Sequence, residues 1–279
     1  MKTKLVLSIG FCIPLCMALK FVMMMLLGLL FNSSFATYLN TPILFMLLGL
    51  SDIFIAFLIV YLFCVLNKEQ VSSIISFDKN WGKNLLYGGL VGCLSVSLGI
   101  LIIYLTKSIS FESNPIRWLF IVTSFVMVAL SAASEEILFR GLMQNKLMSL
   151  SKPSISVIIT SIIFALLHIV NPDISFLYIV NVFLAGIVLG IIFLYSKNIF
   201  FPIGLHIFWN FVQDIADLSG DNLPSIFISN RLSANMINGG SGGFENSIVC
   251  TVILLLLIAF FYSKMTLSQQ KKNTVSATV

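Results

Sequence analysis

The stretch that decides the fold is residues 118–141, WLFIVTSFVMVALSAASEEILFRG. It begins as a long apolar run of the kind that crosses a lipid bilayer. It ends with two adjacent carboxylates and an arginine, Glu135, Glu136 and Arg140. Ionisable side chains inside a membrane are costly and usually mark function. The stretch therefore predicts a transmembrane helix that carries part of a functional site.

The whole chain is also strongly apolar. Its 279 residues are 58% hydrophobic and 10% charged, with a mean hydropathy of +1.04. A soluble domain of this size could not bury so much apolar surface, so the composition indicates an integral membrane protein. The net charge of +5 comes from basic residues scattered along loops, which does not indicate nucleic-acid binding. The 5 cysteines form no CxxC pair, so neither a disulfide framework nor a zinc ribbon is indicated.

Apolar segments of about 20 residues, enough to cross a hydrocarbon core of about 30 Å, recur along the chain. The first is too long for the apolar region of a signal peptide, so we expect it to stay as an uncleaved span. The pattern predicts an all-α polytopic membrane protein with about eight transmembrane helices, at residues 5–31, 42–66, 85–105, 118–142, 154–170, 176–195, 199–218 and 247–263.

The distribution of basic residues predicts the orientation. With the N-terminus inside, the three basic loop residues on the outer side are Lys107, Arg117 and Arg231. The eleven on the inner side are Lys2, Lys4, Lys68, Lys79, Lys83, Lys146, Lys152, Lys197, Lys264, Lys271 and Lys272. Cytoplasmic loops carry such an excess of lysine and arginine, so both termini are predicted to be cytoplasmic.

Polar residues inside the first two predicted spans also need partners. Lys20 and Asp52 are at similar distances from the outer connection between these spans, roughly 15–17 Å along each helix axis. We therefore expect them to form an ion pair. Two GxxxG motifs, at residues 88–92 and 186–190, predict close helix packing and carry no chemistry of their own.

The 2 histidines of the chain, His168 and His206, both fall within predicted spans. If the fourth helix continues to a turn near Lys152, Glu136 lies 16 residues before that lysine and His168 lies 16 residues after it. Equal distances from the turn of a helical hairpin mean equal depth. Glu135 and Glu136 are therefore expected to be able to face His168.

Helical spacing suggests a different chemical role for each of these residues. Glu136 and Arg140 are four residues apart, which suits a salt bridge and leaves Glu135 free to hold a water or a metal beside His168. His206 and Asn210 are also four apart and can donate to a developing oxyanion. Further polar residues, Gln213, Asp214 and Asp217, continue their stripe. The groups together indicate a hydrolytic site inside a membrane, although the same stripe could line a permeation path.

Other protease signatures do not apply. The HExxH motif of zinc peptidases and the GxGD motif of membrane aspartyl proteases are absent. A GxSG sequence occurs at residues 239–242, but it lies in a segment rich in Gly, Ser and Asn. We expect that segment to be a flexible linker.

Three motifs in order resemble a known family. EEILFR (135–140) fits EExxxR, FALLH (164–168) fits FxxxH and HIFWN (206–210) fits HxxxN. Their order and spacing resemble the CAAX protease and bacteriocin-processing (CPBP, or Abi) family of intramembrane endopeptidases, over residues 118–218. The resemblance implies an all-helical membrane core around a catalytic cavity.

The resemblance also implies roles for individual residues. Glu135 with His168 would activate the attacking water, while His206 and Asn210 would stabilise the oxyanion. Glu136 and Arg140 match motif positions with a supporting role. Both a metal-dependent and a metal-free mechanism are compatible with these motifs. Glu135, His168 and His206 could ligate a divalent metal such as zinc and leave a position for water.

The resemblance divides the chain into an N-terminal three-helix membrane region (1–117), a catalytic core (118–218), and a loop, last transmembrane helix and cytoplasmic tail (219–279). It implies an endopeptidase of the bacterial cytoplasmic membrane that cleaves a membrane-associated peptide or protein, in bacteriocin self-immunity or peptide maturation. Two alternatives stay open: an ion- or proton-coupled transporter that uses the same buried charges, and a non-catalytic immunity protein. The sequence determines neither the substrate nor the oligomeric state.

Overall fold

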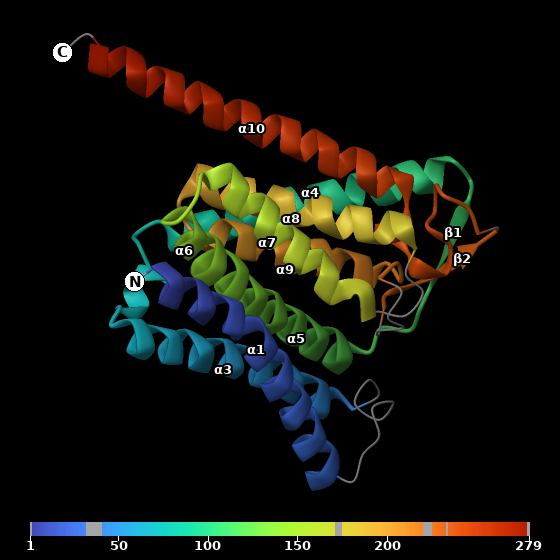
Figure 1. The fold of residues 1–279 in the computed structure, drawn as a ribbon. Helices are drawn as coiled ribbons and strands as arrows, with labels where there is room; N and C mark the ends of the chain where they lie inside the picture. The colour runs from blue at the N-terminus through green and yellow to red at the C-terminus, as the bar shows by residue number, and fades with distance from the viewer. Residues whose placement is uncertain (1, 32–40, 171–174, 220–224, 233, 278–279) are drawn as a thin grey trace.

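The computed structural model describes residues 2–31, 41–170, 175–219, 225–232 and 234–277 (Figure 1). Each predicted span coincides with a helix: α1 (Lys2–Leu30), α3 (Pro42–Asn67), α4 (Trp81–Leu105), α5 (Trp118–Glu136), α7 (Pro153–Leu167), α8 (Phe176–Ser196), α9 (Phe200–Ile215) and α10 (Ile248–Ala277). A π-helix, η2 (Ile137–Gln144), and a short helix, α6 (Asn145–Met148), extend α5 toward a turn before Pro153, as predicted. The chain is an all-α polytopic membrane protein.

Six helices are long and apolar enough to cross a membrane within the part of the chain that the structure describes. They are α1, α3, α4, α8, α10 and the continuous stretch Trp118–Met148. The other two are shorter: α7 has 15 residues and α9 has 16, which is about 23–24 Å of helix. The count of eight spans therefore stays a prediction.

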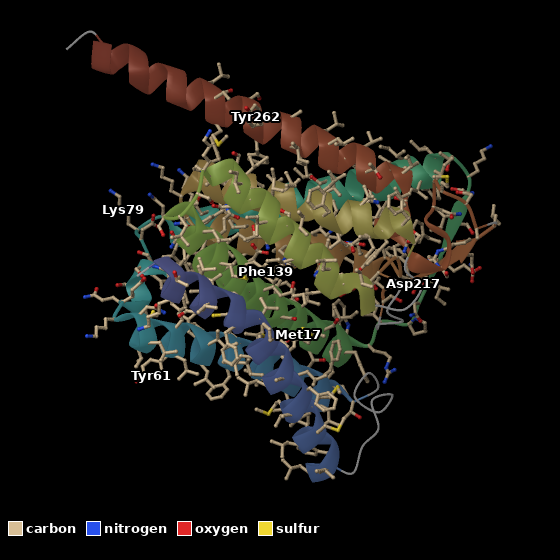
Figure 2. The ribbon with its side chains drawn as sticks, viewed as in Figure 1. Met17, Tyr61, Lys79, Phe139, Asp217 and Tyr262 are labelled. Atoms are coloured by element: carbon tan, nitrogen blue, oxygen red, sulfur yellow. The ribbon has the colours of Figure 1, made fainter. Side chains whose placement is uncertain are left out.

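The two ends of the helical bundle differ in what they carry. The N- and C-terminal ends of the chain lie toward one end of the bundle, and the two strands lie at the other (Figure 1). Lys79 and Asp217 mark these opposite ends in Figure 2. The arrangement agrees with both termini on the lysine-rich side, and the assignment of that side to the cytoplasm stays a prediction.

A small antiparallel ribbon, which the sequence analysis did not predict, joins two of the loops. Strand β1 (Ile109–Ser113) pairs with β2 (Phe227–Arg231), with Ile109 opposite Arg231. The backbone N–H and the hydroxyl of Ser229 both donate to the Asp217 carboxylate, at 2.9 and 3.0 Å. Helix α9 ends at Ile215 and Asp217 has a left-handed backbone (φ 58°). The expectation that Asp217 continues the polar stripe of that helix is therefore wrong.

The segment before α10 is more ordered than the flexible linker that its composition suggested. It forms two 3₁₀ turns, η4 (Gly240–Gly242) and η5 (Phe244–Asn246). Phe244 and Asn238 are fully buried, and the Asn238 amide donates to the carbonyl of Ser108 at 3.1 Å. These contacts hold the segment before α10 against the rest of the protein.

Helices α4 and α9 approach so closely that glycine is required at their crossing. A Cβ atom on Gly88 would lie 2.0 Å from the carbonyl oxygen of Phe201, and one on Gly92 would lie 2.4 Å from that of Leu205. Gly204 of α9 is equally constrained, since its Cβ would lie 2.1 Å from the carbonyl oxygen of Leu85. The predicted packing role of the first GxxxG motif is confirmed, and this packing positions α9, which carries His206 and Asn210.

Gly88→Ala is therefore expected to destabilise the protein by about 3 kcal/mol, the upper part of the usual range for overpacking, because backbone atoms of α9 must move. Gly82→Ala is the matched control in the same helix, since no atom lies within 4 Å of its added Cβ. Thermal unfolding in detergent should show a marked loss for the first variant and no loss for the second. Equal stability of both variants would contradict the packing argument.

The ion pair expected between the first two spans is present. Lys20 Nζ lies 3.0 Å from Asp52 Oδ1, between α1 and α3. An unpaired charge at this position would be costly in a membrane, so the pair joins these two helices. Helix α3 in turn packs against α5, which brings the pair close to the helix that carries Glu135.

Candidate active site

The residues predicted to act together line one cavity of about 210 Å³. Its walls come from α5, α8 and α9, from the end of α7 and from the segment before α10. Glu135, His168, His206 and Asn210 all line it. The structure thus brings together on one cavity four residues that lie on three helical segments far apart in the sequence.

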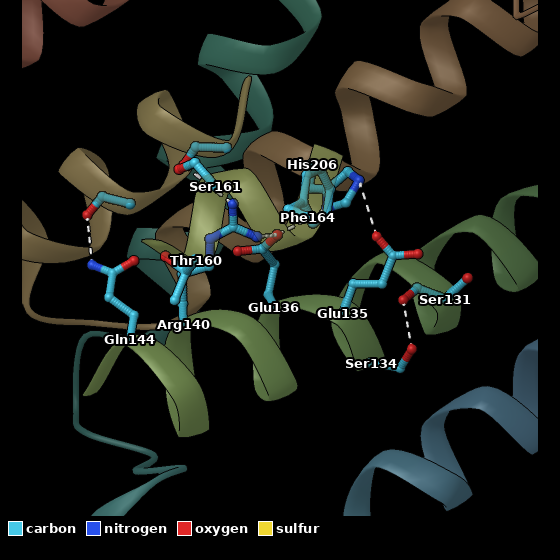
Figure 3. A network of polar contacts seen from close by, with 12 residues as sticks. Ser131, Ser134, Glu135, Glu136, Arg140, Gln144, Thr160, Ser161, Phe164 and His206 are labelled. Carbon is cyan, nitrogen blue, oxygen red and sulfur yellow. Dashed lines mark hydrogen bonds and ion pairs between the residues drawn. The ribbon is translucent and has the colours of Figure 1, made fainter. Parts of the chain in front are cut away.

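Glu135 faces this cavity from the last turn of α5 (Figure 3). Its side chain is 27% exposed, and its Oε2 lies 4.0 Å from His206 Nε2. The next residue, Glu136, points elsewhere and is fully buried. Adjacent residues of a helix point about 100° apart, which explains why one carboxylate reaches the cavity and the other does not.

One carboxylate oxygen of Glu136 contacts both Arg140 and His206. Arg140 Nη1 donates to Glu136 Oε1 at 2.7 Å, which confirms the predicted salt bridge. His206 Nδ1 lies 2.9 Å from the same oxygen, a contact that the sequence analysis missed. A carboxylate can only accept here, so His206 donates from Nδ1 and its Nε2 faces Glu135. Glu136 therefore orients the histidine that the motifs predicted to be catalytic.

The π-helix η2 begins directly after Glu136, and two of its side chains form hydrogen bonds to the backbone of α8. Arg140 Nη2 donates to the carbonyl of Gly186 at 3.2 Å, and Gln144 Nε2 donates to the carbonyl of Gly190 at 3.0 Å. Short π-helical segments are rare and often occur at functional sites. The second GxxxG motif thus has more than a packing role, because the buried carbonyls of its two glycines accept hydrogen bonds from side chains of η2.

His168 lies immediately after the end of α7 and has its own orienting bond. Its Nδ1 is 2.7 Å from the carbonyl oxygen of Phe164. A carbonyl only accepts, so Nδ1 carries the proton and Nε2 of the neutral ring is left as an acceptor. Both histidines are therefore held through Nδ1, His168 by a backbone carbonyl and His206 by a carboxylate, and each leaves Nε2 for the cavity.

A further carboxylate, Glu245, which no motif pointed to, also lines the cavity. Trp209 Nε1 donates to Glu245 Oε1 at 2.8 Å, and Gln213 Nε2 lies 3.4 Å from the same atom. The backbone carbonyl of Glu245 accepts from Asn181 Nδ2 at 2.8 Å. Glu245 belongs to the ordered segment before α10, so only the tertiary structure brings it to the cavity.

If the site uses a metal, its predicted ligands are Glu135, His168 and His206. Among the residues that the structure describes, no three His, Cys, Asp or Glu side chains are grouped closely enough to hold a metal ion. The three-ligand set therefore stays a prediction.

Comparison with known families agrees with the geometry of the cavity. Residues 117–212 match the family model described as type II CAAX prenyl endopeptidase Rce1-like. The matched region runs from the start of α5 into α9 and contains all four predicted cavity residues. The match covers about a third of the chain and supports a CAAX-type intramembrane protease family for this region. No curated protein and no solved structure matches the chain.

Proposed function

We propose that the protein hydrolyses a peptide bond of a membrane-associated peptide or protein, with water as the nucleophile. The observation that supports this most is that Glu135, His168, His206 and Asn210 line one cavity. A cavity lined in this way offers a base, a second acceptor and two hydrogen-bond donors to one bound peptide group. The family match over the same residues supports the same class of reaction.

In the proposed mechanism, Glu135 takes a proton from a water molecule whose other hydrogen is held by Nε2 of His168. The water oxygen attacks the carbonyl carbon of the substrate and forms a tetrahedral intermediate. Nε2–H of doubly protonated His206 and the side-chain amide of Asn210 donate hydrogen bonds to its oxyanion. Glu135 then gives the proton to the nitrogen of the leaving amine, and the C–N bond breaks.

Purified protein in lipid vesicles tests the proposal directly. The probe is an internally quenched peptide that ends in a farnesylated Cys-a-a-X sequence, compared with the same peptide without the lipid. We expect one cleaved bond, with ¹⁸O from labelled water in the new carboxyl group. The proposal is contradicted if neither peptide is cleaved, or if Glu135→Ala cleaves at the rate of the wild type.

Asn210→Ala is expected to lower kcat about 100-fold, the effect of losing one oxyanion donor. The matched control is Asn84→Ala, because Asn84 lies outside the cavity lining and its amide donates to the carbonyl of Asn80, the residue just before α4, at 3.0 Å. Single-turnover rates with the quenched peptide measure both. Unchanged kcat in the Asn210 variant would remove this residue from the proposed mechanism.

We also propose a physiological role in bacteriocin self-immunity or peptide maturation at the bacterial cytoplasmic membrane. This role rests on the family resemblance. Protection of cells that persists in a Glu135→Ala variant would indicate immunity without catalysis. Protection lost together with peptide cleavage would support the proposed role.

A further inference from the structure

Ser131 is a cavity-lining residue that the proposed mechanism does not use. It lies on α5 four residues before Glu135, so the two side chains share one face of the helix. Residues in this relation have Cβ atoms about 5–6 Å apart. Ser131 is thus within reach of a substrate bound at Glu135.

The hydroxyl proton of Ser131 is already committed to a partner outside the cavity. Ser131 Oγ donates to Asp52 Oδ2 at 2.9 Å, and Asp52 Oδ1 is paired with Lys20 Nζ at 3.0 Å. Lysine can only donate and an ionised carboxylate can only accept, so the direction of both bonds is determined. Toward the cavity, the Ser131 oxygen can therefore act only as a hydrogen-bond acceptor, through its lone pairs.

We propose that Ser131 Oγ accepts a hydrogen bond from a main-chain N–H of the substrate. Asp52 and Lys20 are positioning residues: they keep the hydroxyl proton on the Asp52 side, so that Ser131 acts as an acceptor toward the cavity. A peptide bound inside a membrane protein must pair its N–H groups, because an unpaired one is costly there. The inference rests on the proposed function and adds a substrate-binding contact to it. Ser131 lies inside the residues that the family model matches, whereas its positioning residues Lys20 and Asp52 lie outside them, on the N-terminal helices α1 and α3.

Two substitutions test the polarity of this contact. Ser131→Ala removes the acceptor. Asp52→Asn reverses the hydrogen bond between residue 52 and Ser131. The amide oxygen would face Lys20, and the amide N–H would donate to Ser131. The hydroxyl proton of Ser131 would then point toward the cavity, and Ser131 would act as a donor. Each variant is expected to raise KM for the farnesylated quenched peptide about tenfold and to leave kcat nearly unchanged.

Matched variants separate binding from stability. Ser131→Thr keeps the hydroxyl and should restore most of the wild-type KM. Ser134→Ala is the control on the same helix, since Ser134 is fully buried and its hydroxyl donates to the backbone carbonyl of Ser131 at 2.8 Å. A lower unfolding temperature for Ser131→Ala together with a wild-type KM would show a purely structural role and overturn the inference.

Changing the substrate gives the most direct test. Replacing one amide by an ester at each position around the cleaved bond removes one N–H at a time. We expect one position at which the wild type loses about tenfold in kcat/KM and Ser131→Ala loses nothing further. The same ester penalties in both proteins at every position would overturn the inference.

Glu135→Gln in the same assay distinguishes the two levels of failure. If this variant loses cleavage while Ser131→Ala and Asp52→Asn keep the wild-type KM, only the Ser131 contact is wrong. If Glu135→Gln cleaves like the wild type, the proposed function and the contact that depends on it both fail.

Discussion

Glu135→Gln is expected to reduce the rate of peptide cleavage by about 10²–10⁴-fold, the usual contribution of a general base. Glutamine has nearly the same size and still accepts a hydrogen bond, but it cannot take a proton from water. Because Arg140 is paired with Glu136, the buried ion pair should stay intact when Glu135 is replaced. Single-turnover rates with the quenched peptide in vesicles measure the effect, and unfolding temperatures check that the variant is folded.

The chain offers a closely matched control for that experiment. Glu245 is another carboxylate on the same cavity, held by Trp209 at 2.8 Å. Glu245→Gln preserves an oxygen that can accept from Trp209, so we expect cleavage within about threefold of the wild type. A comparable loss in both variants would show that the cavity needs its negative charge in general and would contradict a specific role for Glu135 as base.

Arg140→Met is expected to destabilise the protein by about 3–5 kcal/mol, because it breaks a buried ion pair by removing one partner. Arg140 is 1% exposed and Glu136 is 0% exposed, so neither charge can be solvated by water. The variant also loses the hydrogen bond to the carbonyl of Gly186. Thermal or denaturant unfolding in detergent measures the loss, and an unchanged midpoint would contradict the assigned role of the pair.

The double variant Glu136→Gln/Arg140→Met separates charge from packing. Replacing both partners of a buried ion pair by neutral residues is often nearly neutral for stability. We therefore expect most of the stability lost in Arg140→Met to return. Cleavage should remain low in the double variant, because His206 then lacks the carboxylate that orients it through Nδ1.

Much of the site could be predicted from the sequence because it depends on spacing along helices. Four-residue spacing placed Arg140 beside Glu136, and the equal-depth argument placed Glu135 and His168 at one level. The same kind of count paired Lys20 with Asp52. Length and hydropathy predicted the eight main helices, since a segment that crosses lipid must satisfy its backbone internally.

Other features depend on how each helix is rotated and how closely its neighbours approach. The bond between His206 and Glu136 and the bond between Ser131 and Asp52 each join two helices whose relative rotation no spacing specifies. The π-helix after Glu136 was not predicted from spacing either. Glu245 reaches the cavity from a segment whose Gly-rich composition resembled a linker.

The sequence by itself thus determined which residues share a helix face and a depth, because 3.6 residues per turn and 1.5 Å per residue follow from the backbone alone. Only the tertiary structure decided which of these faces meet. That outcome depends on side-chain packing at close crossings such as Gly88 against Phe201, where a single added carbon would move one helix away from the other.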